Sequence, residues 1–198
     1  ASSNKNIANW ILENKIPDKF VLIHPGMGGS ALNWSQKHYV GLIIGFLSKG
    51  VDVVISGSSL EKNLIDSILQ SVQVSESASS DQKQKGNVFA YFGAFGQDGL
   101  SDYIALINRC TVLVAPSTGP LHLGVALGKT TVSFYPPIQV QSVSRWGPYG
   151  PNKEKNIVFV PEVNCGQKFK CIEQKCPHFL CMDKLQVDRV LSKVFELF

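Results

Sequence analysis

The sequence predicts an α/β fold, a Rossmann-like parallel sheet with helices on both faces. Short apolar runs end at glycines or polar loops, stretches with helical periodicity separate them, and the two kinds of segment alternate along the chain. Continuous Val, Ile and Leu strands joined by helical crossovers are typical of parallel sheets covered on both sides.

The first half of the chain contains three such pairs. The run Phe20 to His24 stops at Pro25 and Gly26, which indicates a strand followed by a loop. We expect helices over 4–14, 36–49 and 60–72 and strands over 20–24, 51–56 and 87–91. Residues 75–86 are rich in Ser, Gln and Lys and predict a solvated connection without a chemical role.

The second half repeats the alternation. It predicts strands over 112–115 and 130–135 and helices over 100–109, 119–127 and 186–197. At 198 residues the chain fits a single domain, 1–198, that contains a cysteine-rich loop over 165–181.

Composition excludes several classes of function. Hydrophobic residues make up 44% and charged residues 17% of the chain, without an apolar run long enough for a bilayer, so we expect a globular protein that does not span a membrane. The net charge of +4 is scattered and forms no basic stripe, which argues against a nucleic-acid partner and suits an anionic small ligand.

Parallel sheets bind ligands at the carboxyl ends of their strands, here the loops after the first four predicted strands. After the first strand, Gly26, Gly28 and Gly29 allow a close approach of the backbone to a ligand, and Ser30 adds a hydroxyl group. This loop suits a diphosphate, or is an ordinary structural turn; it lacks the dinucleotide-binding glycine spacing.

The loop after the fourth strand resembles the start of a helix. Ser117 or Thr118 can cap that helix and Pro120 suits its first turn, so free N–H groups at Gly119 would attract phosphate oxygens. An ordinary capped helix is the alternative. His122 either contacts a ligand or is a core histidine bonded to a backbone carbonyl.

Two further patterns follow from the spacing. Glu61 lies just after the second strand, where nucleotide-binding folds hold a ribose, although an isolated acid there can simply favour a helix start. Gly128, Lys129 and Thr130 mimic the end of a P-loop, but the glycine required five positions earlier is Leu123, and a strand follows instead of a helix. We reject a P-loop.

Three motifs in this order resemble the carboxyl-terminal half of glycosyltransferase family nine, the ADP-heptose:lipopolysaccharide heptosyltransferases. The resemblance covers nearly the whole chain from Phe20 onward. The motifs are His24-Pro25-Gly26-Met27-Gly28-Gly29-Ser30 with Asn33-Trp34, Ser117-Thr118-Gly119-Pro120-Leu121-His122-Leu123, and Arg145-Trp146-Gly147-Pro148-Tyr149-Gly150.

The resemblance implies a GT-B enzyme whose amino-terminal acceptor domain is absent from this chain. It implies inverting, metal-independent transfer from an ADP-sugar, ADP-heptose by analogy, onto a lipopolysaccharide-type acceptor, without a cofactor and with the catalytic base in the absent domain. A cytoplasmic location with at most peripheral contact with the inner membrane is implied too. The implied donor-binding residues are Gly28, Gly29, Ser30, Glu61, Ser117, Thr118, Gly119 and His122.

Two positions depart from the family pattern. Leu32 stands where a lysine is usual, and Ser117 replaces the aspartate of the usual Asp-Thr-Gly-Pro motif. The changes indicate a different sugar donor, compensation by a residue such as Lys37, or a degenerate binding or scaffolding module without turnover. Trp146 and Tyr149 either belong to the site or only pack a loop.

The five cysteines fall into two groups. Cys110 ends a helix and is expected to be a buried apolar residue. Cys165, Cys171, Cys176 and Cys181 have spacings unlike paired C-x-x-C units, so we assign no metal site and expect reduced thiols, with zinc or disulfides as the alternatives. His178 is a substitute ligand or an exposed loop residue.

Overall fold

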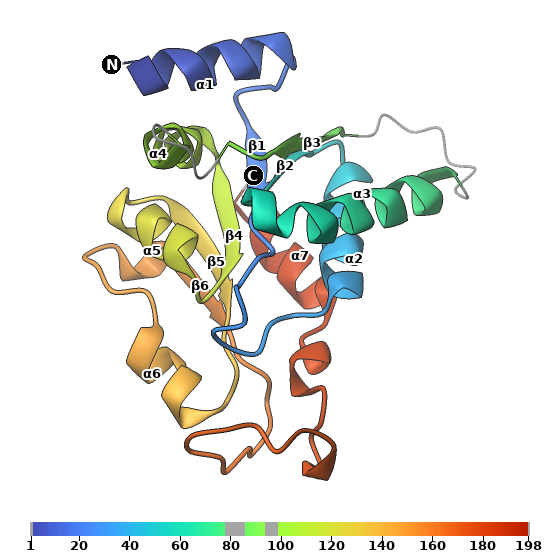
Figure 1. Ribbon diagram of the computed structural model, residues 1–198, viewed down its shortest axis with the longest axis vertical. Coiled ribbons are helices and arrows are strands. Elements are labelled where there is room, and N and C mark those ends of the chain that lie inside the picture. The colour runs from blue at the N-terminus through green and yellow to red at the C-terminus, as the bar shows by residue number, and fades with distance from the viewer. Residues whose placement is uncertain (1, 78–85, 94–98, 198) are drawn as a thin grey trace.

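The computed structural model describes residues 2–77, 86–93 and 99–197. Its centre is a six-stranded, entirely parallel sheet with the order β3-β2-β1-β4-β5-β6 (Figure 1). The strands are β1 (Phe20–Ile23), β2 (Asp52–Ser56), β3 (Val88–Tyr91), β4 (Val112–Pro116), β5 (Thr130–Phe134) and β6 (Asn156–Phe159). The predicted fold class is confirmed.

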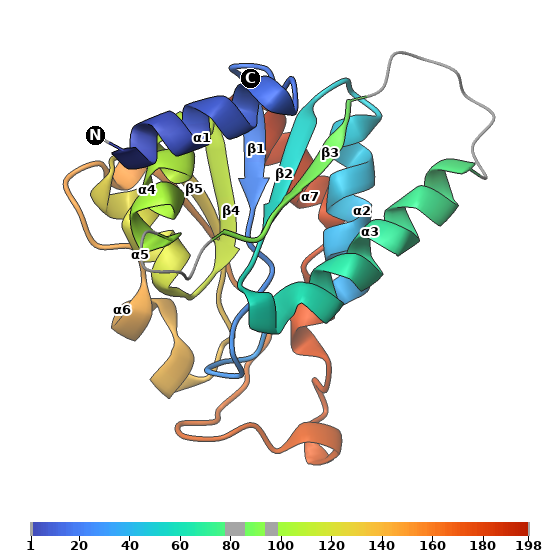
Figure 2. The same cartoon turned by 45° about the horizontal axis from the view of Figure 1, so that its top comes forward.

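Helices cover both faces of the sheet because successive strand side chains point to opposite sides. In β1, Val21 and Ile23 join one core and Phe20 and Leu22 the other. The first core packs under α2 (Gln36–Leu47), α3 (Lys62–Ser77) and α7 (Val187–Phe195). The second packs under α1 (Ser2–Glu13), α4 (Gly99–Arg109) and α5 (Gly119–Ala126), with α1 lying across α4 (Figure 2).

Two features differ from the sequence-based expectation. The strand β6 was not predicted, since its apolar run is short and follows a lysine-rich turn, and pairing with β5 makes it a strand. The helix α3 continues to Ser77, into the segment expected to be a connection, because Ile65, Ile68 and Val72 anchor it in the core. The rest of that segment, 78–85, lies outside the described residues.

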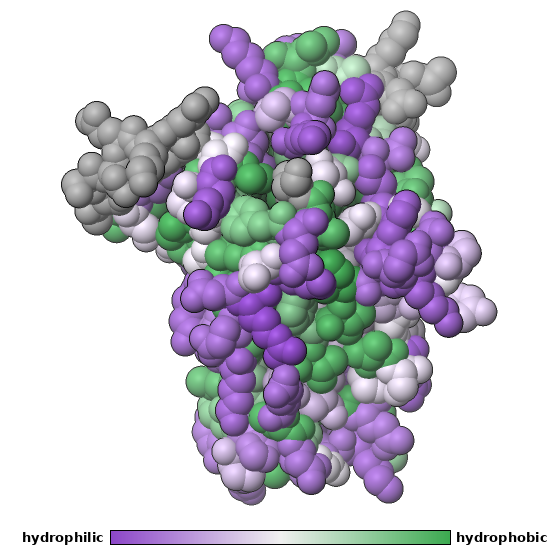
Figure 3. Space-filling model, turned by 180° about the vertical axis from the view of Figure 1, so that it is seen from behind, coloured by the Kyte–Doolittle hydropathy of each residue, from purple (hydrophilic) through white to green (hydrophobic). Residues whose placement is uncertain are grey.

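Long loops extend beyond the carboxyl ends of the strands. The loop after β5 includes a 3-10 turn (Gln139–Gln141) and the short helix α6 (Val143–Trp146). The cysteine-rich loop lies next to it, drawn in orange-red at the bottom of Figure 1. From behind, hydrophilic side chains are spread over the face with hydrophobic ones between them (Figure 3). None of the helices in the described ranges is long and apolar enough to cross a membrane.

Candidate functional site

A cavity of about 480 Å³ opens at the carboxyl ends of the strands; we call it the strand-end cavity. Its walls come from the loops after β1, β4 and β5, which are far apart in the sequence. The lining residues are Ser30, Ala31, Ser117, Thr118, Gly119, His122, Val140, Gln141, Arg145 and Trp146. Parallel α/β sheets bind ligands at this edge, so the cavity is the candidate site.

The loop after β1 reaches the cavity through a tight turn. Gly28 and Gly29 have φ values of 57° and 74°, a left-handed conformation that glycine adopts without steric cost. The Ser30 hydroxyl donates to the Met27 carbonyl oxygen at 3.0 Å, and the Asn33 side-chain amide donates to the Pro25 carbonyl oxygen at 2.7 Å. Ser30 therefore lines the cavity, while the two predicted glycines shape the turn and do not form its wall.

Glu61 lies beside the same loop and outside the cavity lining. Its Oε2 accepts hydrogen bonds from the Ser58 backbone N–H at 2.8 Å and the Ser58 hydroxyl at 2.9 Å, a capping box around the 3-10 turn Ser59–Glu61. Its Oε1 occupies the space next to Gly26, where an added Cβ would come within 1.7 Å of it. The helix-start reading of Glu61 is thus confirmed, and its ribose role stays a prediction.

His24 forms a buried polar cluster beneath this loop. Its Nδ1 lies 3.3 Å from the Ser56 hydroxyl and 3.2 Å from the Tyr103 hydroxyl, and its Nε2 lies 3.9 Å from Glu61 Oε1. Burial lowers the pKa of His24, although the nearby Glu61 carboxylate opposes this shift. A neutral imidazole accordingly ties the end of β1 to β2 and α4.

The loop after β4 starts the helix α5 at the cavity wall. Thr118 occupies the N-cap position but makes no side-chain cap; its hydroxyl donates instead to the Pro116 carbonyl oxygen at 3.2 Å. The predicted capping hydrogen bond is therefore wrong, while Pro120 does lie in the first turn. A Cβ built on Gly119 meets nothing within 4 Å, so the first turn of α5 faces open space.

His122, one turn further along α5, lines the cavity and is exposed. The reading as a core histidine is wrong, because α5 turns its apolar residues Leu121 and Val125 toward the sheet and this histidine away from it. The imidazole is free to face a ligand.

Sequence reasoning missed the wall contributed by the loop after β5. We expected ligand contacts in the loops after the first four strands, yet the cavity is also lined by Val140, Gln141, Arg145 and Trp146. The Trp146 indole N–H donates to the Val140 carbonyl oxygen at 2.9 Å, and the Tyr135 hydroxyl donates to the Trp146 carbonyl oxygen at 2.7 Å. The Arg145-Trp146 motif was the available signal, whereas Tyr149 is 93% exposed and outside the lining.

The two departures from the family pattern occupy different places. Ser117 lines the strand-end cavity. Leu32 instead packs against the core and lines a separate, apolar cavity of about 140 Å³. Lys37 forms an ion pair with Asp183, with 3.2 Å between Nζ and Oδ2, and is absent from the strand-end cavity lining, so its compensating role stays a prediction.

The smaller cavity collects Cys165, Cys171, Cys176 and Cys181, together with His178. All four thiols are free, and no group of three or more His, Cys, Asp or Glu among the described residues is arranged to hold a metal ion. Burial and the neighbouring thiols raise the pKa of Cys181. Cys110 is 1% exposed, as expected. These four cysteines thus line a separate cavity and not the candidate site.

Comparisons with known proteins show the family of this chain. Residues 3–176 match the profile of glycosyltransferase family 9 (heptosyltransferase). A Haemophilus influenzae protein described as a candidate glycosyltransferase is 30% identical over 144 residues, which are 72% of this chain and 37% of that protein.

Solved structures share the fold. A family 9 glycosyltransferase of Veillonella parvula superposes with a TM-score of 0.73 at 16% identity, over 100% of this chain and 51% of that one. Escherichia coli ADP-heptose lipopolysaccharide heptosyltransferase II gives 0.68 at 19% identity, over 99% and 51%. An Escherichia coli heptosyltransferase solved with ADP gives 0.62 at 15% identity, over 96% and 48%. The chain spans about half the length of these solved relatives.

Proposed function

Because the chain belongs to glycosyltransferase family 9, we propose that it binds the nucleotide-sugar donor of a glycosyl transfer reaction in the strand-end cavity. The observation that carries the proposal is the convergence of three loops on this cavity. Hydroxyl groups of Ser30, Ser117 and Thr118 and the open first turn of α5 line it. Hydroxyls, backbone N–H groups and a helix N-terminus are the groups that bind phosphate oxygens.

The nucleoside is assigned to the region next to the cavity, where the loop after β1 meets Glu61. A carboxylate oxygen that is held in place, as Glu61 Oε2 is by Ser58, suits the hydroxyl groups of a ribose. ADP is the proposed nucleotide, in line with the ADP in a heptosyltransferase of similar fold. Gly28 and Gly29 then serve the diphosphate by shaping the turn that presents Ser30.

The proposed reaction is a single inverting displacement. A hydroxyl oxygen of the acceptor forms a bond to the anomeric carbon while the bond from that carbon to the diphosphate oxygen breaks, and ADP leaves with the electron pair. The α5 amides and the neighbouring hydroxyls stabilise the charge that develops on the diphosphate. The base that takes the acceptor proton is expected from a second domain, so none of the described residues receives that role.

The sugar and the acceptor are the finer part of the proposal. Heptose and a lipopolysaccharide-type acceptor follow from the family and from the named activity of the Escherichia coli protein of similar fold. With such an acceptor, the protein would act at the cytoplasmic face of the inner membrane and contact the membrane peripherally. Ser117 in place of the usual aspartate bears on the sugar, since it lines the cavity beside Thr118.

Isothermal titration of the chain with ADP, UDP and GDP, and with ADP-heptose, tests the donor assignment. We expect ADP to bind more tightly than UDP or GDP, and ADP-heptose at least as tightly as ADP. A preference for UDP or GDP would overturn the ADP assignment, and no binding of any of the four would overturn donor binding by this chain.

The departures at Leu32 and Ser117 favour one alternative, a binding or scaffolding module without turnover. An assay of ADP release, with the full-length protein, ADP-heptose and an acceptor, distinguishes the enzyme from the binding module. Donor binding with ADP release supports the enzyme, and donor binding without release, in the presence of an acceptor that a related enzyme glycosylates, supports the module.

A further inference from the structure

The strand-end cavity has hydroxyl groups on several walls but little fixed charge. Among the described residues that line it, Arg145 is the one that carries a permanent charge. In the part of the chain that the structure describes, its guanidinium forms no ion pair, and it lies 5.8 Å from the centroid of the Trp146 ring. A cation without an acidic partner at the rim of a polar cavity is available to an anionic ligand.

Among the residues that the structure describes, no other cation lines the cavity. Leu32, one of the two departures from the family pattern, lines the apolar cavity of the cysteine-rich loop. Lys37 is held by Asp183 outside the lining. A nucleoside diphosphate nevertheless carries negative charge that must be neutralised when it leaves water. We therefore expect this cation to come from the loop after β5.

The backbone that carries Arg145 is anchored on its carboxyl-terminal side. The adjacent Trp146 accepts a hydrogen bond from Tyr135 through its carbonyl oxygen and donates one to Val140 through its indole. A Cβ on Gly147 would come within 2.4 Å of the Val143 carbonyl oxygen, so the chain turns tightly after α6. These contacts limit the positions from which the guanidinium can extend and lower the entropy that a ligand contact costs.

A bridge also joins this wall to the loop after β1. The Leu32 backbone N–H donates to Gln141 Oε1 at 3.2 Å, which connects the segment carrying Ser30 and Ala31 to the segment carrying Arg145. The Tyr135 hydroxyl donates to the Trp146 carbonyl oxygen, which fastens the end of β5 to the loop that follows it. Arg145 thus belongs to one connected wall and is not a side chain on an isolated loop.

We propose that Arg145 is the residue that binds the diphosphate of the nucleotide donor, in the cavity that the first turn of α5 also lines. The inference rests on the proposed donor binding. Its planar guanidinium presents paired N–H donors to phosphate oxygens, which a lysine ammonium does not. The diphosphate then lies between Arg145 and the amides at Gly119, with Ser30 and Thr118 at its sides.

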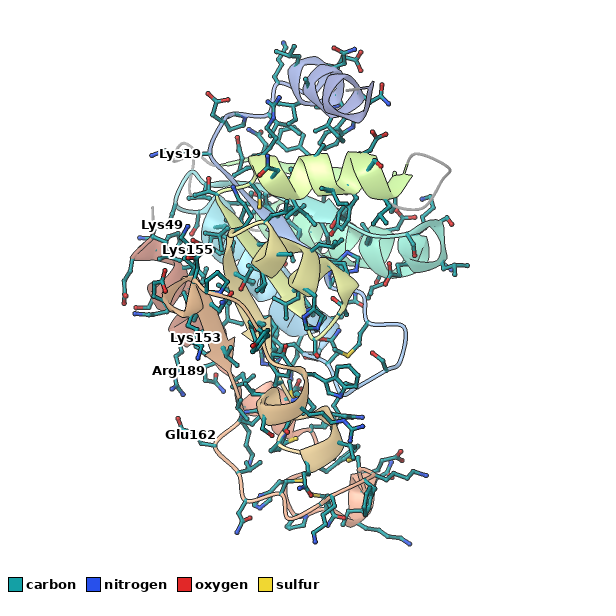
Figure 4. The ribbon with its side chains drawn as sticks, turned by 90° about the vertical axis from the view of Figure 1, so that its left-hand side faces the viewer. Lys19, Lys49, Lys153, Lys155, Glu162 and Arg189 are labelled. Atoms are coloured by element: carbon teal, nitrogen blue, oxygen red, sulfur yellow. The ribbon has the colours of Figure 1, made fainter. Side chains whose placement is uncertain are left out.

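Four proteins test the assignment by titration with ADP and with adenosine, which lacks the diphosphate: the unchanged chain, Arg145→Gln, Arg145→Lys and Lys49→Gln. Lys49, labelled in Figure 4, is an exposed cation in the turn before β2 and is not among the residues that line the cavity, so its replacement removes the same charge elsewhere. We expect Arg145→Gln to weaken ADP binding about tenfold or more, because a hydrogen bond to a charged group is lost. The ADP affinity of Arg145→Lys should lie between that of Arg145→Gln and that of the unchanged chain.

The controls separate this inference from the proposed function. Adenosine affinity should not change in any variant, and ADP affinity should not change in Lys49→Gln. Equal ADP binding by Arg145→Gln and the unchanged chain overturns the role of Arg145 and leaves donor binding intact. Equal losses in Arg145→Gln and Lys49→Gln overturn it too, as an effect of net charge. Failure of the unchanged chain to bind ADP instead overturns the proposed function. Arg145 is exposed, and matching melting temperatures verify that every variant is folded.

Discussion

Oε1 of Glu61 lies 3.9 Å from Nε2 of His24, in the space that Gly26 leaves open beside the first loop of the candidate site. This contact joins the end of β1 to the turn after β2. It connects a buried imidazole, a carboxylate proposed to bind ribose and a glycine that no larger residue can replace without displacing that carboxylate. Two predictions follow from it directly.

The stability of the chain should fall on mild acidification. Because burial lowers the pKa of His24 below that of the unfolded chain, the unfolded state binds more protons as the pH drops below about 6.5. The same direction holds for His38, where burial is again the main cause. Urea unfolding at pH 7.5 and 5.5 should show a lower free energy at pH 5.5, with a smaller difference in His24→Asn. Equal differences in both proteins would exclude His24 as a source.

Gly26→Ala should destabilise the chain by about 1–3 kcal/mol, the range for an added methylene without room. Its Cβ would come within 1.7 Å of Glu61 Oε1, while Ser58 holds the other carboxylate oxygen. Chemical denaturation of Gly26→Ala, Glu61→Ala and the double variant measures the coupling. We expect the alanine at 26 to cost less when Glu61 is shortened; additive effects would contradict the contact.

Gly119→Ala should weaken ADP binding without lowering the stability of the chain. The added methyl meets nothing within 4 Å, and alanine favours a helix more than glycine does, so the melting temperature should stay or rise slightly. ADP affinity should fall about tenfold, the scale of one lost hydrogen bond to a charged group, because the methyl occupies space next to the proposed diphosphate. Gly124→Ala in the same helix is the contrast: its Cβ would lie 2.5 Å from Leu113 Cδ2, and it should lower the melting temperature. Unchanged ADP affinity in Gly119→Ala would place the diphosphate elsewhere.

Trp34→Phe should loosen the cysteine-rich loop. The Trp34 indole N–H donates to the Leu185 carbonyl oxygen at 2.9 Å, and its loss leaves a buried acceptor unsatisfied, at a cost of about 1–3 kcal/mol. Cys181, 9% exposed, should then react faster with a thiol reagent. Trp10→Phe, on α1, is the matched control and should leave the rate for Cys181 unchanged. Equal rates in both variants would show that Trp34 does not hold the loop.

Much of the architecture was predictable because it depends on local pattern. The strands β1 and β4 are continuous apolar runs, β2 and β5 are rich in β-branched residues, and Pro25 and Gly26 mark the end of the first. The strand β6 escaped prediction because four residues at a sheet edge acquire their structure from pairing with β5, which the sequence around them does not display.

The residues of the candidate site were likewise predictable only in part. Ser30, Ser117, Thr118, Gly119 and His122 were predicted to face a ligand and do line the strand-end cavity. Gly28, Gly29 and Glu61 were predicted beside them and lie in adjoining segments. Val140 and Gln141 carried no sequence signal, because a glutamine and a valine in a loop have no chemistry that marks them as part of a site.

The sequence by itself determined the alternating fold, the family and the two loops with glycine and hydroxyl residues, since each depends on residues close together in the chain. Only the tertiary structure decided which way Leu32, Lys37 and His122 face, and that Arg145 joins the cavity from the loop after β5. The direction of a side chain depends on what packs against its backbone. Those neighbours, such as Gln141 against Leu32, are distant in sequence and meet only when the sheet has formed.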